Sequence, residues 1–358
     1  MPDEGGRAAA GPGASAAQTG LPVEAVEWGF RLLAGRAPVN QAEFDSFKAL
    51  PDIDAMRRAF TNVADFHGFF SSVLAGYPAY ALPLFLLRPP QAANLDWRFE
   101  PPDLEQPGSQ LCTASQFAGP AFVEIAEAMN LDLAASRKVW EQIWVVAVLA
   151  TAGLIAPDRQ GLGLETNHER IGSLLASRGV QVQASGTPAP KPALAETRRL
   201  QLFYPEIINI EDFDRLVSFA ELDPRGVGRA GQDAFDFCWS LNMPERLGSI
   251  DAALDFFEAS LVPLKPGGLA LHTMMFNLTS DQFTWDLPGL VILRRSDIER
   301  LAERLAAGGH RIVGLNTHPG SEAADEKVKT EATGIPGLRQ RHGFVVTTSF
   351  GLALRKAG

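Results

Sequence analysis

From residue 160 onward, short apolar segments alternate with amphipathic ones, and this alternation constrains the fold more than any other feature of the sequence. Apolar runs bounded by turn residues predict strands, and amphipathic segments between them predict helices that cross over to a parallel neighbour. We predict strands at residues 161–164, 180–184, 216–221, 235–239, 269–275, 312–315 and 343–354. We predict helices at residues 168–178, 250–261 and 296–307. The sequence therefore predicts an α/β domain built on a parallel sheet.

The residues before this sheet have a different hydrophobic pattern. Apolar residues recur at three- and four-residue spacing from Leu21, and Pro38 and Pro51 separate the repeats, which predicts a small bundle of short helices. A proline-rich stretch follows, and helical pattern then resumes before the sheet. We predict a disordered tail at 1–20, a helical bundle at 21–76, a proline-rich linker or arm at 77–115, and a sheet domain at 116–358, divided into a helical lead-in at 116–158 and a core at 159–358.

Charge and cysteine usage exclude several kinds of function. The net charge of −10 argues against a protein that binds nucleic acid through phosphates. Cys112 and Cys238 form no paired motif, and the six histidines are scattered, so we expect no disulfide framework and no metal site. The apolar stretch at 80–87 is too short to span a bilayer, and the N-terminus has no secretory signal pattern. We expect a cytoplasmic protein without a membrane span.

One glycine-rich turn suggests a nucleotide site. Gly161 and Gly163 stand between a predicted strand and a predicted helix, where glycines allow the backbone to approach a ligand closely. The next two positions of this turn are Glu165 and Asn167. Asn tolerates a left-handed backbone better than Glu does. A tight turn that only joins strand to helix is an equally good interpretation of the motif.

Five segments together resemble bacterial class I S-adenosylmethionine (SAM)-dependent methyltransferases of the kind found with cell-surface saccharide genes. The resemblance covers residues 108–357, and the segment FDFCWSLNMPERLGSIDAALDFFEASLVPLKPGGLALHT is its most specific part. The five segments lie at residues 109–117, 136–164, 235–273, 294–310 and 343–356. The resemblance implies a Rossmann-like, seven-stranded methyltransferase sheet, preceded here by a small all-α N-terminal domain, with SAM at the carboxyl ends of the strands.

The resemblance also implies a set of cofactor-binding residues, and the sequence departs from the family's pattern at several of its positions. Glu165 and Asn167 replace glycines, and Gly186 stands where the family has the acid that binds the ribose. Arg246 replaces a histidine and Met275 an acid, so the departures put SAM binding itself in question. The candidate cofactor-binding residues are Gly161, Gly163, Glu165, Asn167, Ser185, Asp223, Ser240 and Trp140.

Two side chains are candidate catalytic residues, and each has a structural alternative. Glu245 could act as a base on an acceptor hydroxyl, or it could be a charge that favours a helix N-terminus. His272 could take a proton from the acceptor, or it could be a hydrogen-bonded histidine of the core. Asp223 likewise could bind an adenine amine or form a turn before Pro224.

Two functions of different classes remain open. The first is a SAM-dependent methyltransferase that O-methylates a sugar or another small polar acceptor. The second is an inactive protein of the same fold that acts as a partner or scaffold and contacts proteins through its N-terminal helices, which could also support a homo-oligomer. A nicotinamide-dependent dehydrogenase is a distant third, because Gly186 leaves it without the ribose-binding acid as well.

Overall fold

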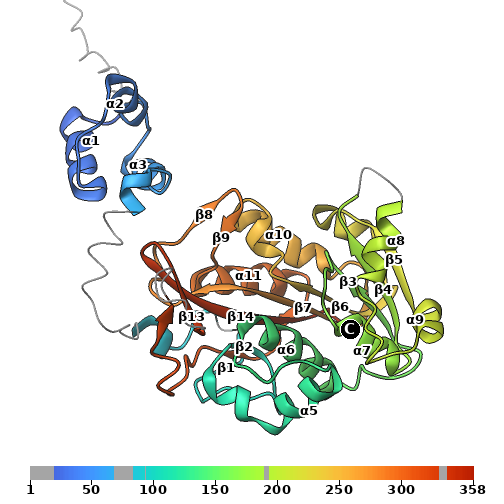
Figure 1. Ribbon diagram of the computed structural model, residues 1–358. Helices are drawn as coiled ribbons and strands as arrows, with labels where there is room; N and C mark the ends of the chain where they lie inside the picture. The colour runs from blue at the N-terminus through green and yellow to red at the C-terminus, as the bar shows by residue number, and fades with distance from the viewer. Residues whose placement is uncertain (1–19, 68–83, 93, 189–192, 330–336) are drawn as a thin grey trace, which may run out of the picture. The chain divides into compact units, whose positions relative to one another are not determined.

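A computed structural model describes residues 20–67, 84–92, 94–188, 193–329 and 337–358 of the chain (Figure 1). The tail predicted at 1–20 lies outside these residues except for Gly20. The chain divides into two compact units, Met1–Gly76 and Tyr77–Gly358.

The first unit is held together by aromatic packing. The rings of Phe30, Phe47 and Phe60 lie with their centroids 4.6–4.8 Å apart. Side-chain oxygens of Asn40 and Asp52 accept backbone N–H groups in the first turns of two of the helices, which is the preferred cap at that position. The elements are α1 (Val23–Gly29), a π-helical turn (Phe30–Ala34), α2 (Gln41–Lys48) and α3 (Ile53–Phe60).

The second unit is built on a sheet whose central strands run in the order β5-β4-β3-β6-β7-β14. The first five are parallel to one another, and β14 runs antiparallel to β7. This order, with its reversed last strand, is the Rossmann-like methyltransferase sheet, so the predicted fold class is confirmed. The strands are β3 (Gln160–Gly163), β4 (Gln181–Gly186), β5 (Val217–Glu221), β6 (Phe235–Leu241), β7 (Leu264–Asn277) and β14 (Val345–Arg355).

Shorter strands extend the sheet beyond β14. The segment predicted as a linker or arm contributes two of them, β1 and β2, and β2 pairs directly with β14. The sequence analysis did not predict these strands, because two or three residues are too few to show an alternating pattern. The short strands are β1 (Trp97–Arg98), β2 (Ser109–Leu111), β10 (Arg311–Ile312), β11 (Leu315–Asn316), β12 (Val328–Lys329) and β13 (Arg339–His342), and β8 (Asp286–Leu287) pairs with β9 (Leu290–Val291) in a separate sheet.

Helices cover both faces of the sheet, α10 and α11 on one and α5, α6 and α7 on the other (Figure 1). Side chains of β6 alternate between the two cores: Phe237 and Trp239 face α6 and α7, whereas Cys238 faces α10. No described helix is long and apolar enough to cross a bilayer. The helices are α5 (Pro120–Ala128), α6 (Arg137–Thr151), α7 (Ile171–Ser177), α8 (Ala193–Leu200), α9 (Ile210–Leu216), α10 (Ile250–Ser260) and α11 (Arg295–Ala307), with short helical turns at Leu84–Leu87, Ala114–Ala118, Pro224–Arg229 and Pro244–Arg246.

The LKPGG segment lies at the start of β7 and does not end helix α10. Helix α10 ends at Ser260, so Pro266 does not terminate it. The segment is instead the irregular start of β7, where Gly267 has a φ of +76° and the pairing with β6 shifts register. A proline and a left-handed glycine suit such a bulge as well as they suit a turn.

Candidate functional site

The candidate site is the edge of the sheet at which β3, β4 and β6 end. Because these strands are parallel, the loops that follow them lie at the same edge. The loops contain residues 164–170 after β3, Thr187 after β4, and Asn242–Glu245 after β6. Ligands of open α/β sheets bind at this edge.

The loop after β3 keeps a left-handed turn although Glu165 stands in place of a glycine. The φ of Glu165 is +52° and that of His168 is +49°. Ser185 on β4 fixes the loop: its hydroxyl donates to the carbonyl of Gly163 at 2.7 Å, and its own carbonyl accepts the N–H of Thr166 at 2.9 Å. Ser185 therefore holds the loop in position with its hydroxyl already bonded.

The two glycines of β3 are required by packing. A Cβ atom on Gly161 would lie 2.5 Å from the ring of Phe237, and one on Gly163 would lie 2.7 Å from the indole of Trp239. Real side chains essentially never approach so closely. The methyl of Thr166 would lie still closer to the Cβ on Gly163, at 2.4 Å, so packing against this methyl and two aromatic rings of β6 explains the glycine pattern without any ligand.

The carboxylate of Glu165 reaches the end of β4. Its Oε2 accepts the backbone N–H of Thr187 at 2.8 Å and the hydroxyl of Thr187 at 2.9 Å. The guanidinium of Arg198 donates to the carbonyl of the same residue at 2.6 Å. Thr187 is therefore held from both sides, next to Gly186, where the family has its ribose-binding acid.

Glu245 lies after β6 in a partly buried position. Its Oε1 accepts the backbone N–H of Met275 at 2.8 Å. Burial and, to a smaller extent, the nearby carboxylate of Glu141 raise the pKa of Glu245 to about 7, against the weaker, opposite effect of Lys138. A carboxyl group that titrates near neutral pH is suited to exchange protons with an acceptor.

Glu141 on α6 ties three elements together at this edge. Its Oε1 accepts the hydroxyl of Ser349 on β14, and its Oε2 accepts the amide of Asn242 after β6, both at 2.5 Å. Asn242 has a φ of +53°, a conformation that Asn tolerates. Neither Glu141 nor Asn242 is among the candidate cofactor-binding and catalytic residues given above. A charge inside the apolar helical run VWEQIWVV was the available signal for Glu141.

His272 lies in the core between β7 and α10. It is 0% exposed, and its two ring nitrogens are hydrogen-bonded to the hydroxyls of Ser240 at 2.8 Å and Ser260 at 3.0 Å. Burial lowers its pKa to about 3, so the ring is neutral at physiological pH. These bonds favour the interpretation of His272 as a hydrogen-bonded core residue. The same bond engages the hydroxyl of Ser240, which was a candidate for binding the cofactor.

Three candidates remain: Trp140 lies in the core, Asp223 lies in the loop after β5 at the same carboxyl edge as the site, and Asn167 lies in the loop after β3. Trp140 is fully buried on α6, where its indole donates to the side chain of Gln116 and stacks on Trp144. Asp223 is exposed and accepts the backbone N–H of Arg225 at 2.9 Å, which is the turn-forming alternative. Asn167 is exposed in the loop after β3.

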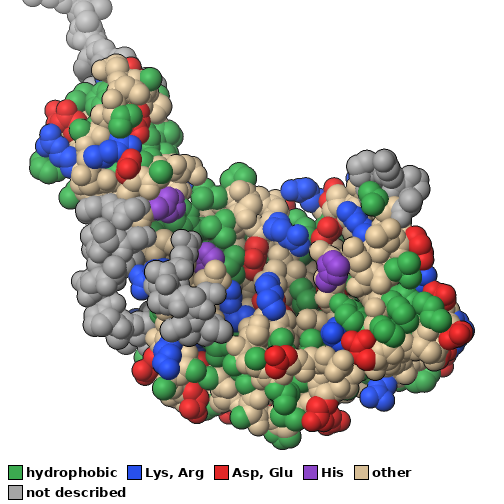
Figure 2. Space-filling model, viewed as in Figure 1, with side chains coloured by type: hydrophobic (Ala, Val, Ile, Leu, Met, Phe, Trp, Pro, Cys, Tyr) green, Lys and Arg blue, Asp and Glu red, His purple; other side chains and the backbone are tan. Residues whose placement is uncertain are grey.

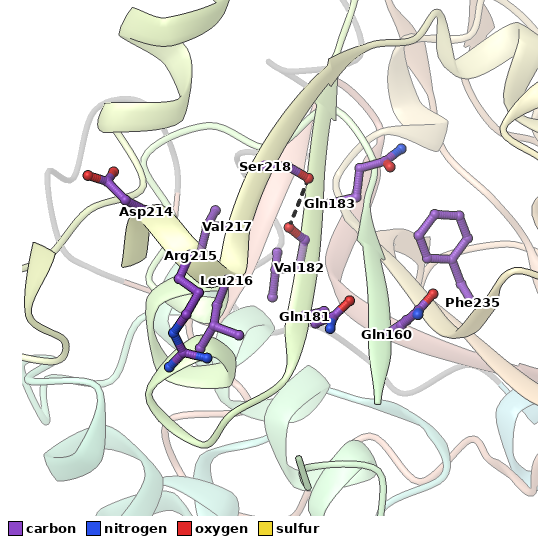
Figure 3. Close-up of a pocket in the computed structure, with 10 residues that line it drawn as sticks. All are labelled: Gln160, Gln181, Val182, Gln183, Asp214, Arg215, Leu216, Val217, Ser218 and Phe235. Carbon is purple, nitrogen blue, oxygen red and sulfur yellow. Dashed lines mark hydrogen bonds between the residues drawn. The ribbon is translucent and has the colours of Figure 1, made fainter. Parts of the chain in front are cut away.

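A cavity of about 270 Å³ opens at the opposite edge of the sheet. Gln160, Gln181 and Ser218, at the amino ends of β3, β4 and β5, line it together with Arg215 (Figure 3). It is separated from the loops at the carboxyl ends by the length of the strands. We do not assign it to the site.

The described residues contain no group of three His, Cys, Asp or Glu side chains that could hold a metal ion. Basic and acidic side chains are interspersed over the described face of the larger unit in Figure 2. The net charge of the chain is therefore not gathered in one patch on this face.

Comparison with known proteins finds solved structures that are similar to part of the chain. No family model and no curated protein matches the sequence. Magnesium protoporphyrin IX methyltransferase from Synechocystis PCC 6803, solved with bound SAH, is similar at 12% identity over 67% of this chain and 97% of that chain, with a TM-score of 0.39. Phosphoethanolamine N-methyltransferase 2 from Haemonchus contortus, solved with S-adenosyl-L-methionine, is similar at 19% identity over 44% of this chain, with a TM-score of 0.33, and the match spans 35% of that chain's length. These likenesses do not bear on activity.

Proposed function

We propose that the chain is a SAM-dependent methyltransferase that methylates a hydroxyl of a sugar or another small polar acceptor. The observation that carries the proposal is Glu245, a carboxyl group with a pKa near 7 at the carboxyl edge of a methyltransferase-type sheet. Its Oε1 is fixed by the N–H of Met275, and its Oε2 makes no hydrogen bond to the described residues. The free oxygen is the one that would meet an acceptor.

The loop after β3 fits a polar nucleotide in part. The backbone N–H groups of Asn167 and His168 donate to no described residue, and Glu165 offers a carboxylate oxygen. SAM, when bound, supplies a methyl group on a positively charged sulfur. Glu245 would then accept the proton of the acceptor hydroxyl at Oε2, while Met275 keeps the carboxylate in one orientation.

The alternative proposal is an inactive protein of this fold that serves as a partner or scaffold. It is supported by three candidate residues whose polar atoms are bonded inside the core, namely Trp140, Ser240 and His272. It is also supported by Gly186, which leaves β4 without an acid.

Isothermal titration of the full chain with SAM and with its demethylated product SAH separates the two. The methyltransferase proposal expects saturable heat at micromolar ligand. No heat of binding up to millimolar concentrations of both ligands would contradict the methyltransferase proposal and favour the inactive scaffold protein.

A further inference from the structure

Strand β4 ends at Gly186 and has no carboxylate of its own there, but a carboxylate from another segment lies beside the end of β4. It belongs to Glu165, on the loop after β3, and not to β4 itself. Its Oε2 bonds to the N–H and the hydroxyl of Thr187, the residue directly after Gly186. The structure thus brings an acid to this place from a neighbouring strand's loop.

The position of this carboxylate is well fixed for an exposed loop. Two hydrogen bonds at 2.8 and 2.9 Å hold one of its oxygens, and Arg198 restrains Thr187 from the other side at 2.6 Å. The second oxygen, Oε1, accepts no hydrogen bond from the described residues. An ionised carboxylate has lone pairs to spare for further donors, so Oε1 is available to hydroxyl groups.

The backbone of Glu165 points to the same use. A glutamate with a φ of +52° is unfavourable, because the left-handed region brings Cβ against the carbonyl oxygen. A glycine would relieve this strain but would carry no carboxylate. Strain of this kind persists where the surrounding structure holds it and is concentrated at functional sites.

A side chain at Gly186 would meet groups other than Thr187. A Cβ atom there would lie 3.2 Å from the guanidinium of Arg198 and 3.2 Å from the ring of Phe219. Its side chain would point toward these groups, on the sheet face that Val182 and Ala184 share, and not along the edge where Glu165 meets Thr187.

We propose that Glu165 binds the ribose of the nucleotide cofactor, with Oε1 accepting the ribose hydroxyls, and so replaces the acid missing from β4. This inference rests on the proposed function, since it needs a bound adenosine ligand. The carboxylate of Glu165 is turned to β4, where it bonds to Thr187.

The test measures binding of SAH, and of an SAH analogue whose ribose lacks both hydroxyls, to the full chain by titration calorimetry. Glu165→Gln keeps the size and the backbone strain of the residue and removes only the charge. We expect this variant to bind SAH about 10- to 100-fold more weakly than the wild type, as for the loss of a charged hydrogen bond. The wild type should bind the analogue more weakly than SAH by a similar factor, whereas the variant should bind the analogue almost as well as it binds SAH.

Glu127→Gln, on an exposed position of α5, is the matched control and should bind SAH as the wild type does. Thermal unfolding of each variant establishes that it is folded. Wild-type binding with an unchanged affinity in Glu165→Gln would overturn the role of Glu165 and leave the proposed function standing. A wild type that binds no SAH at all would overturn the proposed function itself, and this inference with it.

Discussion

The indole nitrogen of Trp239 donates a 2.5 Å hydrogen bond to the carboxylate of Glu169, and this bond joins β6 to the loop that follows β3. Both side chains are buried. Burial raises the pKa of Glu169 from 4.5 to about 7, against a smaller opposite effect of the indole. A carboxyl group of the loop at the candidate site therefore changes its protonation near neutral pH.

The stability of the protein should depend on this carboxyl group. Since the folded-state pKa lies above the unfolded value, the stabilisation is fully present below about pH 4.5 and is lost as the pH rises through about 7. Glu169→Gln keeps an acceptor for Trp239 but cannot ionise. Its free energy of unfolding relative to the wild type should increase by about 2 kcal/mol between about pH 5 and about pH 8.

Urea unfolding at the two pH values measures this difference. Glu124→Gln, on an exposed position of α5, is the control and should follow the wild type at both. A Glu169→Gln profile parallel to that of the wild type would show that Glu169 titrates normally.

His272 should matter for stability and not for chemistry. His272→Ala removes a buried ring and leaves the hydroxyls of Ser240 and Ser260 without this partner, so we expect a loss of about 2–4 kcal/mol in unfolding free energy. SAH affinity of the folded protein should not change. His168→Asn, in the exposed loop, should remain within about 0.5 kcal/mol of the wild type. A His272→Ala protein that is as stable as the wild type but fails to transfer methyl groups would support a catalytic role for His272.

Gly163 should resist substitution because of Trp239. Gly163→Ala places a Cβ 2.7 Å from the indole, and we expect a loss of about 1–3 kcal/mol from overpacking. Gly172→Ala is the matched control inside α7, where the new Cβ has only an ordinary contact at 3.8 Å, and a gain of up to about 1 kcal/mol is expected. Chemical denaturation compares the two, and equal effects would contradict the packing account of the glycine motif.

Glu245 should govern the rate of methyl transfer. A carboxylate acts as a base only when ionised, so the rate should rise with pH through about 7, the pKa of Glu245. Glu245→Gln should lower kcat by about 10²- to 10⁴-fold and leave SAH affinity unchanged. The measurement uses the first hydroxyl acceptor that the wild type methylates. A variant with undiminished kcat would assign the base to another group.

The sequence predicted β3, β4, β5, β6, β7 and β14 because their signals are local. The strand predicted at 312–315 was wrong, since β10 and β11 are two short strands there that pair with different neighbours. Short apolar runs bounded by turn residues marked β3 to β7, and only residues 261–263 separate α10 from β7. The strands β1 and β2 could not be predicted, since their place in the sheet depends on pairing with β11 and β14, which lie far along the chain.

The site was less predictable, because the direction of a side chain depends on contacts between distant segments. His272 lies within β7 and bonds to Ser260 of α10, whereas Glu245 follows β6 and bonds to the backbone of Met275 at the edge. The bond between Glu165 and Thr187 joins residues that are 22 positions apart. Glu165 was among the candidate cofactor-binding residues, but the spacing of the sequence did not indicate that its carboxylate reaches Thr187.

The central claim is that the loop after β3 and the end of β4 form a nucleotide site. A crystal structure of the full chain grown with SAH tests it most directly. The account predicts the adenosine at the carboxyl edge, against residues 164–168, with a ribose hydroxyl within hydrogen-bond distance of Glu165 Oε1. Density for SAH in the amino-end cavity beside Gln181, or none at saturating ligand, would contradict it.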